Sequence, residues 1–433
     1  MPGVTDIIGA KEKPTTGEWT RVHARGGWYL IALSLAMAAG GYVRTTVSPL
    51  QEAIRITLVL TDNQMALLQG PALGVPMAIA AIPLGLIIDR HPRVRLLFLL
   101  SVLSLVSTVL TAMAPAFSLL FAARCLAGLA GYATVPIVMS LLSDLYPPAQ
   151  RGRATMTVSV GQLGGVSGAF ALGGMLLTTS SSRPGGWHWA MLWLAAPLIP
   201  VALLLLRVRE PPRASVPAKK TAARQVWREL WLYRAVLAPL FVGIVIIETG
   251  VGAVLTWAAP TLSRRFALQP DSIGAIMSAG LLFSGILGPV GGGLLADVCQ
   301  RAGGSRRTML VLTALAVLCI PTGLFAIIPG VVPSSILLGM LMTIMLATAV
   351  MGMTLFTIVV PGDLRGLCMA VLVGANILFA MGLAPVIVSL LSGALGGLAM
   401  IGNALTVVCV TTGVFAAMTF AFGSRYLPSV PTR

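Results

Sequence analysis

Three ionisable side chains, Arg44, Arg124 and Glu248, lie inside long apolar stretches of the sequence. At bilayer depth such a group costs at least about 2.5 kcal/mol on insertion scales, so it rarely occurs there without a partner or a task. A guanidinium offers a planar fork of donors that suits a carboxylate or a phosphate. A carboxyl group near an arginine can exchange a proton as that arginine approaches or withdraws. The three residues therefore indicate anion binding by Arg44 or Arg124 and proton transfer by Glu248.

Each of these residues also has a purely structural interpretation, which the sequence leaves open. Arg124 could be a permanent brace that is hydrogen-bonded to backbone carbonyls of neighbouring helices. Arg44 could extend its charged end to the membrane surface, and Glu248 could be the static partner of an arginine.

Uncharged side chains in the same stretches add candidates for substrate contact. Gln162 and Asn376 lie 214 residues apart, so a repeat with this offset would give them matching places. Either residue could instead brace a helix. The aromatic candidates are Tyr42, Tyr132 and Trp257, for which plain packing is the competing interpretation.

The composition shows what kind of element must position these residues. Of 433 residues, 57% are hydrophobic, against 29 basic and 13 acidic ones, which is too apolar for a soluble domain. A membrane helix needs roughly 20 apolar residues, so the chain can supply on the order of twelve. Soluble enzymes and nucleic-acid-binding proteins are excluded. The sequence has no GxxxxGK[ST] or HExxH motif and no paired cysteine spacing, so we expect no catalysis, cofactor or metal site.

Apolar stretches bounded by charges, prolines or glycines predict twelve membrane helices in two groups of six. They lie at 28–50, 64–88, 96–113, 118–143, 154–178 and 187–206, and at 236–259, 272–296, 308–329, 334–360, 366–391 and 401–424. We expect an all-α membrane protein of two pseudo-symmetric six-helix bundles. The predicted segments are a tail at 1–26, bundles at 27–206 and 235–424, a linker at 207–234 and a tail at 425–433. Residues 225–234 have the spacing of a basic amphipathic helix that lies on the membrane surface.

The distribution of lysine and arginine predicts the orientation, because cytoplasmic loops retain an excess of positive charge. The two tails, the linker and the loops on the same side hold 23 of the 29 basic residues, and the opposite side holds 4. Both termini are thus expected in the cytoplasm of a multi-pass protein, most simply in a bacterial inner membrane. The net charge of +16 is explained by this topology and by contact with anionic lipid headgroups, so no nucleic-acid partner is needed.

The two halves repeat short motifs, as expected of a protein built from two related halves. Gly85-x-x-x-Asp89 ends the second span and Gly293-x-x-x-Asp297 ends the eighth, and a basic loop follows each. Arg151-Gly152 after the fourth span matches Arg365-Gly366 after the tenth at an offset of 214 residues.

These motifs carry a resemblance to a known family. Gly85-x-x-x-Asp89-Arg90-x-x-Arg93 resembles the 2/3-loop motif of the major facilitator superfamily, and Arg124-x-x-x-Gly128 resembles its span-four motif. The resemblance covers residues 28–424. It implies two six-helix halves that rock about a central cavity lined by spans one, four and seven. That arrangement would place Arg44, Arg124 and Glu248 around one substrate path.

Within the superfamily the chain is most similar to the spinster-like group. The similar segments are Ser143-Asp144-Leu145-Tyr146-Pro147-Pro148, Trp257-x-x-Pro260, and Pro361-x-x-x-Arg365-Gly366 with Asn376 downstream. Members of that group carry an Asp-Arg pair in span one and a Gly-Glu-Ala step in span four. Here those places read Val43-Arg44 and Gly131-Tyr132-Ala133, so both acids are missing. We infer that proton coupling has moved to Glu248.

The resemblance also implies a gate at the cytoplasmic side, where loop charges hold the halves together while the other side is open. Asp89 and Asp297 can pair with loop arginines, and Asp144 with Arg151 and Arg153 would complete the cluster. The competing interpretation is a solvated charge cluster that only sets topology. The expected gating residues are Gly85, Asp89, Arg90, Arg93, Asp144, Arg151, Asp297 and Arg365.

These features together predict a secondary transporter that works by alternating access. Its expected substrate is a small or amphiphilic organic anion, a carboxylate or a phosphorylated lipid-like solute, and its expected coupling ion is the proton. Its other partners would be membrane lipids, and it would act as a monomer. Two alternatives remain: an exporter of hydrophobic cations with Glu248 as counter-ion, and a non-transporting membrane sensor.

Overall fold

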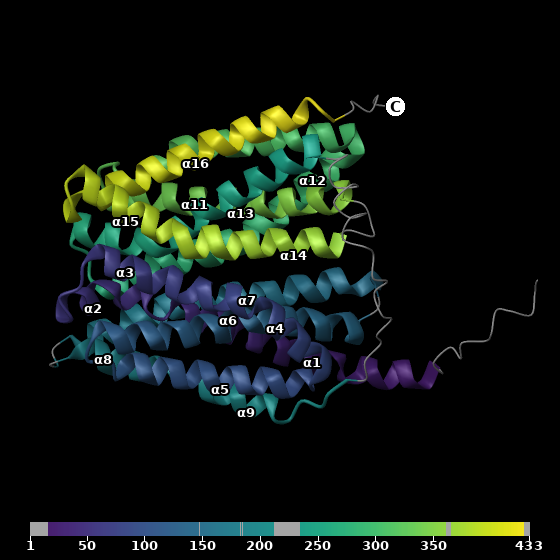
Figure 1. The fold of residues 1–433 in the computed structure, drawn as a ribbon, viewed down its shortest axis with the longest axis horizontal. Helices are drawn as coiled ribbons and strands as arrows, with labels where there is room; N and C mark the ends of the chain where they lie inside the picture. The colour runs from purple at the N-terminus through teal and green to yellow at the C-terminus, as the bar shows by residue number, and fades with distance from the viewer. Residues whose placement is uncertain are drawn as a thin grey trace, which may run out of the picture.

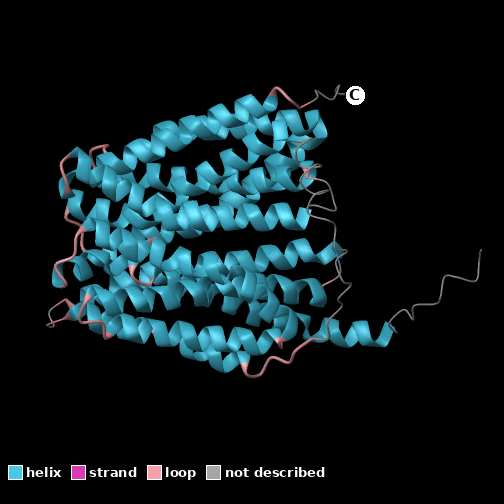
Figure 2. Cartoon of the chain, viewed as in Figure 1, coloured by secondary structure: helices cyan, strands magenta, loops and turns pink. Residues whose placement is uncertain are grey.

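The computed structural model describes residues 16–146, 148–181, 183, 185–211, 234–360 and 365–427. Over these residues the chain folds into helices and has no strand (Figure 2). Eleven of the helical segments described are long and apolar enough to cross a membrane. The predicted all-α membrane protein is thereby confirmed. The amphipathic helix predicted for the end of the linker lies outside the described residues, except for its last residue, Arg234.

One of the eleven segments contains two crossings. Helix α12 extends over Pro270–Thr322, and Gly304 within it has φ 67° and ψ −160°, which are not helical values. A straight helix of 53 residues would measure about 80 Å, whereas the hydrocarbon core of a bilayer is about 30 Å thick. Glycine tolerates the positive φ at which the chain breaks. Segment α12 therefore supplies spans eight and nine, and the part of the chain described here has the twelve predicted crossings.

The N-terminal half contains six spans made from nine α-helices. Helix α1 begins inside the segment predicted as a polar tail, and span two consists of α3 with α4, while span six consists of α8 with α9. The bounds are α1 Thr16–Thr45, η1 Ser48–Leu50, α2 Gln51–Thr57, α3 Asp62–Gln69, α4 Pro71–Arg90, α5 Arg93–Ala112, α6 Phe117–Leu145, α7 Pro148–Ser180, α8 Gly186–Leu194 and α9 Leu198–Leu205.

The C-terminal half contains the other six spans. Span eleven is divided into α14, the π-helical turn η3 and α15. The bounds are α11 Arg234–Phe266, α12 as above, η2 Gly323–Ala326, α13 Val331–Val359, α14 Arg365–Asn376, η3 Ile377–Leu383, α15 Ala384–Leu395, η4 Leu398–Met400 and α16 Ile401–Ser424.

Figure 1 shows the helices side by side along one common direction, with the N-terminal half below the C-terminal half. One end of the bundle holds the start of α1, the start of α14 and the end of α16, and we call it the terminal end. The opposite end holds α2 and α3, and we call it the clamp end.

Among the described residues, the hydrogen bonds between the two halves all lie toward the clamp end. In the pair formed by α7 and α12, the Ser167 and Ser278 hydroxyl oxygens are 2.8 Å apart, and the Asp271 amide donates to Thr178 Oγ1 at 3.1 Å. Between α15 and α3, Ser389 Oγ donates to Asn63 Oδ1 at 2.6 Å. The two halves are therefore held together at this end.

Small residues set the distance between α1 and α7. A Cβ atom at Gly165 would lie 1.9 Å from the carbonyl oxygen of Ala38, and one at Gly161 would lie 2.6 Å from that of Ser34. By contrast, nothing lies within 4 Å of a Cβ built at Gly164. Close backbone approach is the main source of helix association in a bilayer, where lipid tails remove the hydrophobic driving force.

We predict that Gly165→Ala destabilises the protein by about 1–3 kcal/mol, because the added methyl group forces α7 away from α1. Gly164→Ala, on the same helix and one residue away, should leave stability unchanged. Thermal unfolding of both variants in detergent measures the difference. Equal melting temperatures for the two variants would contradict the close contact.

Candidate functional site

A cavity of about 390 Å³ lies between the two halves near the middle of the bundle. Its walls come from α1, η1, α3, α4, α6 and α7 on one side and from α11, α12, α13 and η3 on the other. Among the described lining residues, only Arg44 and Glu248 carry a charge. The cavity thus has one guanidinium on the N-terminal wall and one carboxyl group on the C-terminal wall.

Arg44 lies across the N-terminal wall of this cavity. Its Nε donates to the carbonyl oxygen of Gly40 at 3.0 Å, and its guanidinium carbon lies 4.2 Å from the centre of the Tyr132 ring. Gly131 provides the room, since a Cβ atom there would lie 2.6 Å from Arg44 Cγ. None of the ion pairs among the described residues involves Arg44. Its remaining donors are available to a ligand in the cavity.

Glu248 lies in the middle of α11 and lines the opposite wall. Its side chain is half-buried, and the structure gives it no ion pair or hydrogen bond within the described part of the chain. The static arginine partner that the sequence left open for Glu248 is thus not found among these residues. A carboxyl group in this position suits proton exchange with the cavity.

Arg124 occupies a different environment from Arg44. It is 1% exposed, and its guanidinium donates to the carbonyl oxygens of Leu68, Val43 and Arg44 and to Gln69 Oε1, at 2.6 to 3.4 Å. It is absent from the described cavity lining. This geometry favours the brace interpretation of Arg124 over substrate contact.

The uncharged candidates also divide into residues that line the cavity and residues that do not. Gln162 and Tyr132 line the cavity, whereas Tyr42, Trp257 and Asn376 are absent from its described lining. Trp257 is fully buried, and its Nε1 donates to the Pro385 carbonyl oxygen at 3.0 Å. The Tyr42 hydroxyl and Asn376 Oδ1 are buried without a hydrogen-bond partner in the part of the chain that the structure describes. The structure therefore places Arg44, Tyr132, Gln162 and Glu248 on the wall of one cavity, and the other candidates are absent from its described lining.

The two walls of the cavity differ in polarity. The N-terminal wall contributes hydroxyl and amide groups beside Arg44: Thr45, Ser48, Gln69, Ser159 and Gln162. The C-terminal wall is largely aliphatic and sulfur-containing apart from Glu248, Thr256 and Ser284: Val251, Val254, Leu255, Leu281, Met342, Met345, Leu346, Val350 and Met381. Such a cavity suits a solute with one polar and one apolar side.

The predicted gating charges at the terminal end form a compact cluster in the N-terminal half. Arg93 is 4% exposed and pairs with Asp144 at 2.5 Å and with Glu210 at 3.3 Å. The Glu210 carboxylate also accepts the backbone amides of Arg93 and Val94 at 2.9 and 2.7 Å. Glu210, which the sequence reasoning missed, thus caps the positive N-terminus of α5.

Arg151 has another role from the one expected, because Asp144 is bound by Arg93. The Arg151 guanidinium donates to the carbonyl oxygens of Tyr146 and Ser143 at 2.9 and 2.7 Å, at the C-terminus of α6. A cation at this position satisfies carbonyls that the helix leaves unpaired. Of the other expected gating residues, Gly85, Arg90 and Asp297 are exposed. The side chains of Asp89 and Arg365 lie outside the described residues.

An ion-pair cluster that the sequence did not predict joins the halves at the clamp end. Arg264 of α11 donates to Glu52 Oε1 at 2.6 Å and to Asp62 Oδ1 and Oδ2 at 2.7 and 2.8 Å. Arg55 adds a contact of 3.1 Å to Glu52. We call Glu52, Arg55, Asp62 and Arg264 the clamp. Their side chains are only 11–19% exposed, so solvent screens these pairs less than it screens surface pairs.

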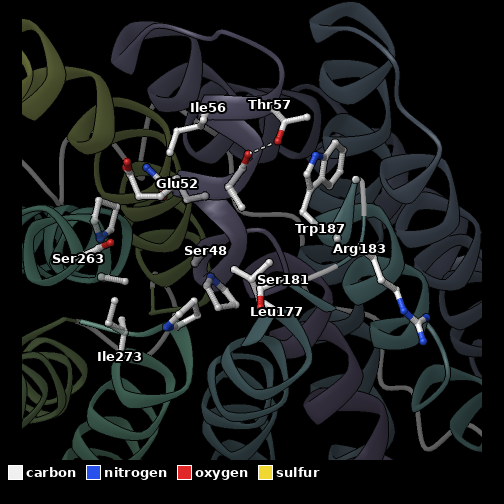
Figure 3. A pocket seen from close by; sticks show the side chains of 18 residues that line it. Ser48, Glu52, Ile56, Thr57, Leu177, Ser181, Arg183, Trp187, Ser263 and Ile273 are labelled. Atoms are coloured by element: carbon white, nitrogen blue, oxygen red, sulfur yellow. Dashed lines mark hydrogen bonds between the residues drawn. The ribbon is translucent and has the colours of Figure 1, made fainter. Parts of the chain in front are cut away.

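A second cavity, of about 420 Å³, lies beside the clamp (Figure 3). Ser48, Glu52 and Trp187 line it from the N-terminal half, and Ser263 and Ile273 line it from the C-terminal half. Because both halves form its wall, its shape depends on the clamp being closed.

The only sequence signal for the clamp was the presence of opposite charges in loops on one side of the membrane. Glu52 and Asp62 lie between spans one and two, and Arg264 ends span seven, more than 200 residues later. No local spacing connects these residues. From the sequence, Arg55 and Arg264 were therefore recognisable only as basic residues in loops.

Comparison with known proteins identifies the family of the chain. Residues 29–259, more than half of the chain, match the sequence profile of the Major Facilitator Superfamily. The chain belongs to the major facilitator superfamily. It is therefore a multi-pass membrane protein, and this membership agrees with the resemblance of the motifs in the second and fourth spans.

Curated relatives of this superfamily member match only in part. A triacylglyceride transporter of Mycobacteroides abscessus is 29% identical over 239 residues, which are 53% of this chain and 44% of that protein. The arabinose-proton symporter of Bacillus subtilis is 23% identical over 222 residues, which are 47% of this chain and 44% of the symporter. The matched region thus spans less than half the length of these relatives.

Solved structures show the shared fold over nearly the whole chain. A bacterial homologue of the human lysosomal transporter Spinster, in an inward-facing and unoccupied conformation, has a TM-score of 0.76 at 21% identity. The match covers 95% of this chain and 98% of that structure. A D-xylose-proton symporter has a TM-score of 0.68 at 17% identity, and the match covers 90% of this chain and 96% of the symporter. The predicted similarity to spinster-like transporters is confirmed for the fold.

We predict that Arg264→Gln loosens the clamp and shifts the protein toward states that are open at this end. The reporter is Ser263→Cys beside the clamp, in a background with the five native cysteines replaced by serine. Its labelling rate by a polar maleimide should rise about fivefold or more, since a coupling of this kind is typically worth about 1–3 kcal/mol. Arg183→Gln, an exposed arginine near the same end that is not part of the clamp, is the matched control. Equal labelling rates in all backgrounds would show that the clamp does not hold this end closed.

Proposed function

We propose that this transporter moves an organic anion by alternating access and that proton transfer at Glu248 drives the movement. The observation that carries the proposal is the charge content of the central cavity. One arginine and one carboxyl group line it, they come from opposite halves, and neither has an ionic partner among the described residues.

Arg44 would bind the anionic group of the substrate. Its Nε is used by Gly40, and its guanidinium face rests on Tyr132, so the remaining N–H groups keep a fixed direction. Gln162, Ser159 and Thr45 on the same wall would complete the polar contacts. A carboxylate or a phosphate fits this donor set equally well.

The apolar C-terminal wall supports an amphiphilic substrate whose body is hydrocarbon or aromatic. The anionic end would face Arg44, and the body would lie against the methionine and leucine side chains of α11, α12 and α13. Methionine adapts its shape easily, which suits substrates of varying form. A volume of about 390 Å³ is sufficient for a small amphiphile.

Glu248 would carry the coupling proton. In the protonated form it adds no charge to an apolar wall, and in the ionised form it is drawn toward Arg44 when no substrate occupies the cavity. Arg44 would then pair with the substrate in one state and be drawn to the ionised Glu248 in the other. Substrate binding and proton transfer would thereby be linked, as coupling requires.

The two ends of the molecule would act as alternate gates. With the clamp closed, access to the cavity would be from the terminal end, for which the distribution of loop charges predicts a cytoplasmic location. The cluster of Arg93, Asp144 and Glu210 would hold the loop between spans two and three in position, with Asp89, Asp297 and Arg365 acting when that end closes. The proposed setting is a bacterial inner membrane, in which the protein acts as a monomer.

We predict that Arg44→Gln weakens anion transport by about 10- to 100-fold, the usual effect of losing a charge-assisted hydrogen bond. Uptake of labelled aliphatic and aromatic carboxylates and of lysophospholipids into proteoliposomes with an imposed pH gradient measures it. Arg209→Gln, an exposed arginine outside the cavity, is the control. Unchanged affinity in Arg44→Gln would remove this residue from the site. Flux of hydrophobic cations in place of anions would establish the alternative in which Glu248 is a counter-ion, and no flux of any solute would favour a sensor.

We predict a different outcome for Glu248→Gln, because glutamine keeps the shape of the side chain and cannot carry a proton at neutral pH. Exchange of labelled for unlabelled substrate should continue, whereas accumulation driven by a pH gradient should stop. Both measurements use the same proteoliposomes, so binding and coupling are separated within one experiment. Accumulation that persists in the variant would exclude Glu248 as the proton carrier.

A further inference from the structure

A groove of about 700 Å³ lies on the C-terminal half, and its described lining shares no residue with the central cavity. It follows α11 and α16 toward the terminal end, and in Figure 1 α16 forms the outer edge of the bundle there. The wall is apolar, with Val242, Phe415, Met418 and Phe422 each 43–61% exposed. Among its described lining residues, Thr419 has the one hydroxyl side chain, which donates to its own helix at the Ala416 carbonyl oxygen.

Helices α11 and α16 pack closely beside the groove. A Cβ atom at Gly423 would lie 3.1 Å from Pro239 Cβ and 2.6 Å from Met309 Cε. The proline ring and the absent side chain bring the helix backbones together and leave the larger side chains on either side as walls. The groove is therefore a built feature of the helix pair.

Two guanidinium groups lie at the terminal end of this apolar groove. Arg234 begins α11, Arg425 follows the last residue of α16, and both line the groove and are exposed. Tyr426 is the next residue and packs edge-on against Phe422, with 5.2 Å between the ring centres. Tyrosine is enriched where hydrocarbon meets the headgroup layer of a membrane, which places the two arginines at headgroup level.

We propose that this groove is a binding site for one anionic phospholipid of the membrane. Its phosphate would lie between Arg234 and Arg425, and its acyl chains would lie along Val242, Phe415, Met418 and Phe422. The positive charge at the rim selects an anionic headgroup, because guanidinium groups at the membrane surface attract the charge of a phosphate. The apolar length of the groove selects a lipid over free phosphate, which would gain nothing from the aliphatic and aromatic wall.

The site is distinct from the proposed substrate cavity, since none of its lining residues is shared with that cavity. An occupant would fill the groove between the first span and the last span of the C-terminal half. It would thus stabilise the half that carries Glu248 without touching the transport path.

The test is native mass spectrometry of the purified full chain mixed with phosphatidylglycerol and phosphatidylcholine of identical acyl chains. The unaltered protein should retain phosphatidylglycerol preferentially. In Arg234→Gln/Arg425→Gln that preference should fall about tenfold or more, because each arginine near a membrane surface contributes roughly 1 kcal/mol. Arg207→Gln, an exposed arginine at the same end of the other half, is the matched control and should keep the preference.

A second variant tests the groove itself. Val242→Trp leaves both arginines in place and fills the apolar channel, so bound phosphatidylglycerol should be lost. An excess of inorganic phosphate should not displace the lipid from the unaltered protein. Equal retention of the two lipids by the unaltered protein, or an unchanged preference in the double variant, would overturn the proposal. Displacement by inorganic phosphate would do the same. Melting temperatures in phosphatidylcholine alone verify that each variant is folded.

Discussion

A charge withdrawn from water inside a membrane must be neutralised or fully hydrogen-bonded, and this constraint explains where the charges of this protein lie. Arg124 donates to three carbonyl oxygens and an amide oxygen, and Arg93 and Arg264 are each paired with two carboxylates. Arg44 and Glu248 are the exceptions among the described residues, and both face the one cavity that the halves enclose at mid-depth. A group left unsatisfied by the fold is the group that a substrate or a proton can satisfy.

The two ends of the bundle use charge in different ways. At the clamp end the ion pairs run between the halves, so separating the halves requires breaking them. At the terminal end the ion pairs of Arg93 run within the N-terminal half and fix the start of α5. Ion pairs therefore join the two halves at the clamp end, whereas those of Arg93 at the terminal end stay within one half.

Much of the fold could be predicted from the sequence, because hydrophobic length, breaks in apolar stretches and loop charge are local properties. The twelve crossings and the placement of Arg44 and Glu248 on a shared path follow from them and from the resemblance to the superfamily. The clamp could not be predicted, since it joins residues more than 200 positions apart with no repeated spacing. Arg44 and Arg124 both lie in long apolar stretches of the sequence, so the sequence alone does not distinguish a structural brace from a residue that lines the cavity. The structure distinguishes them. Likewise, the capping of α5 by Glu210 depends on how the chain returns after α9.

The hydrogen bonds of Arg124 have a mechanical consequence. The Arg124 guanidinium on α6 donates to main-chain oxygens in the last turns of both α1 and α3, and one of those oxygens belongs to Arg44 itself. These hydrogen bonds thus join three helices of the N-terminal half at one point, next to the residue that faces the cavity. In the proposed alternating access, this half would therefore move as one rigid unit, and the direction of the Arg44 donors would stay fixed during the movement.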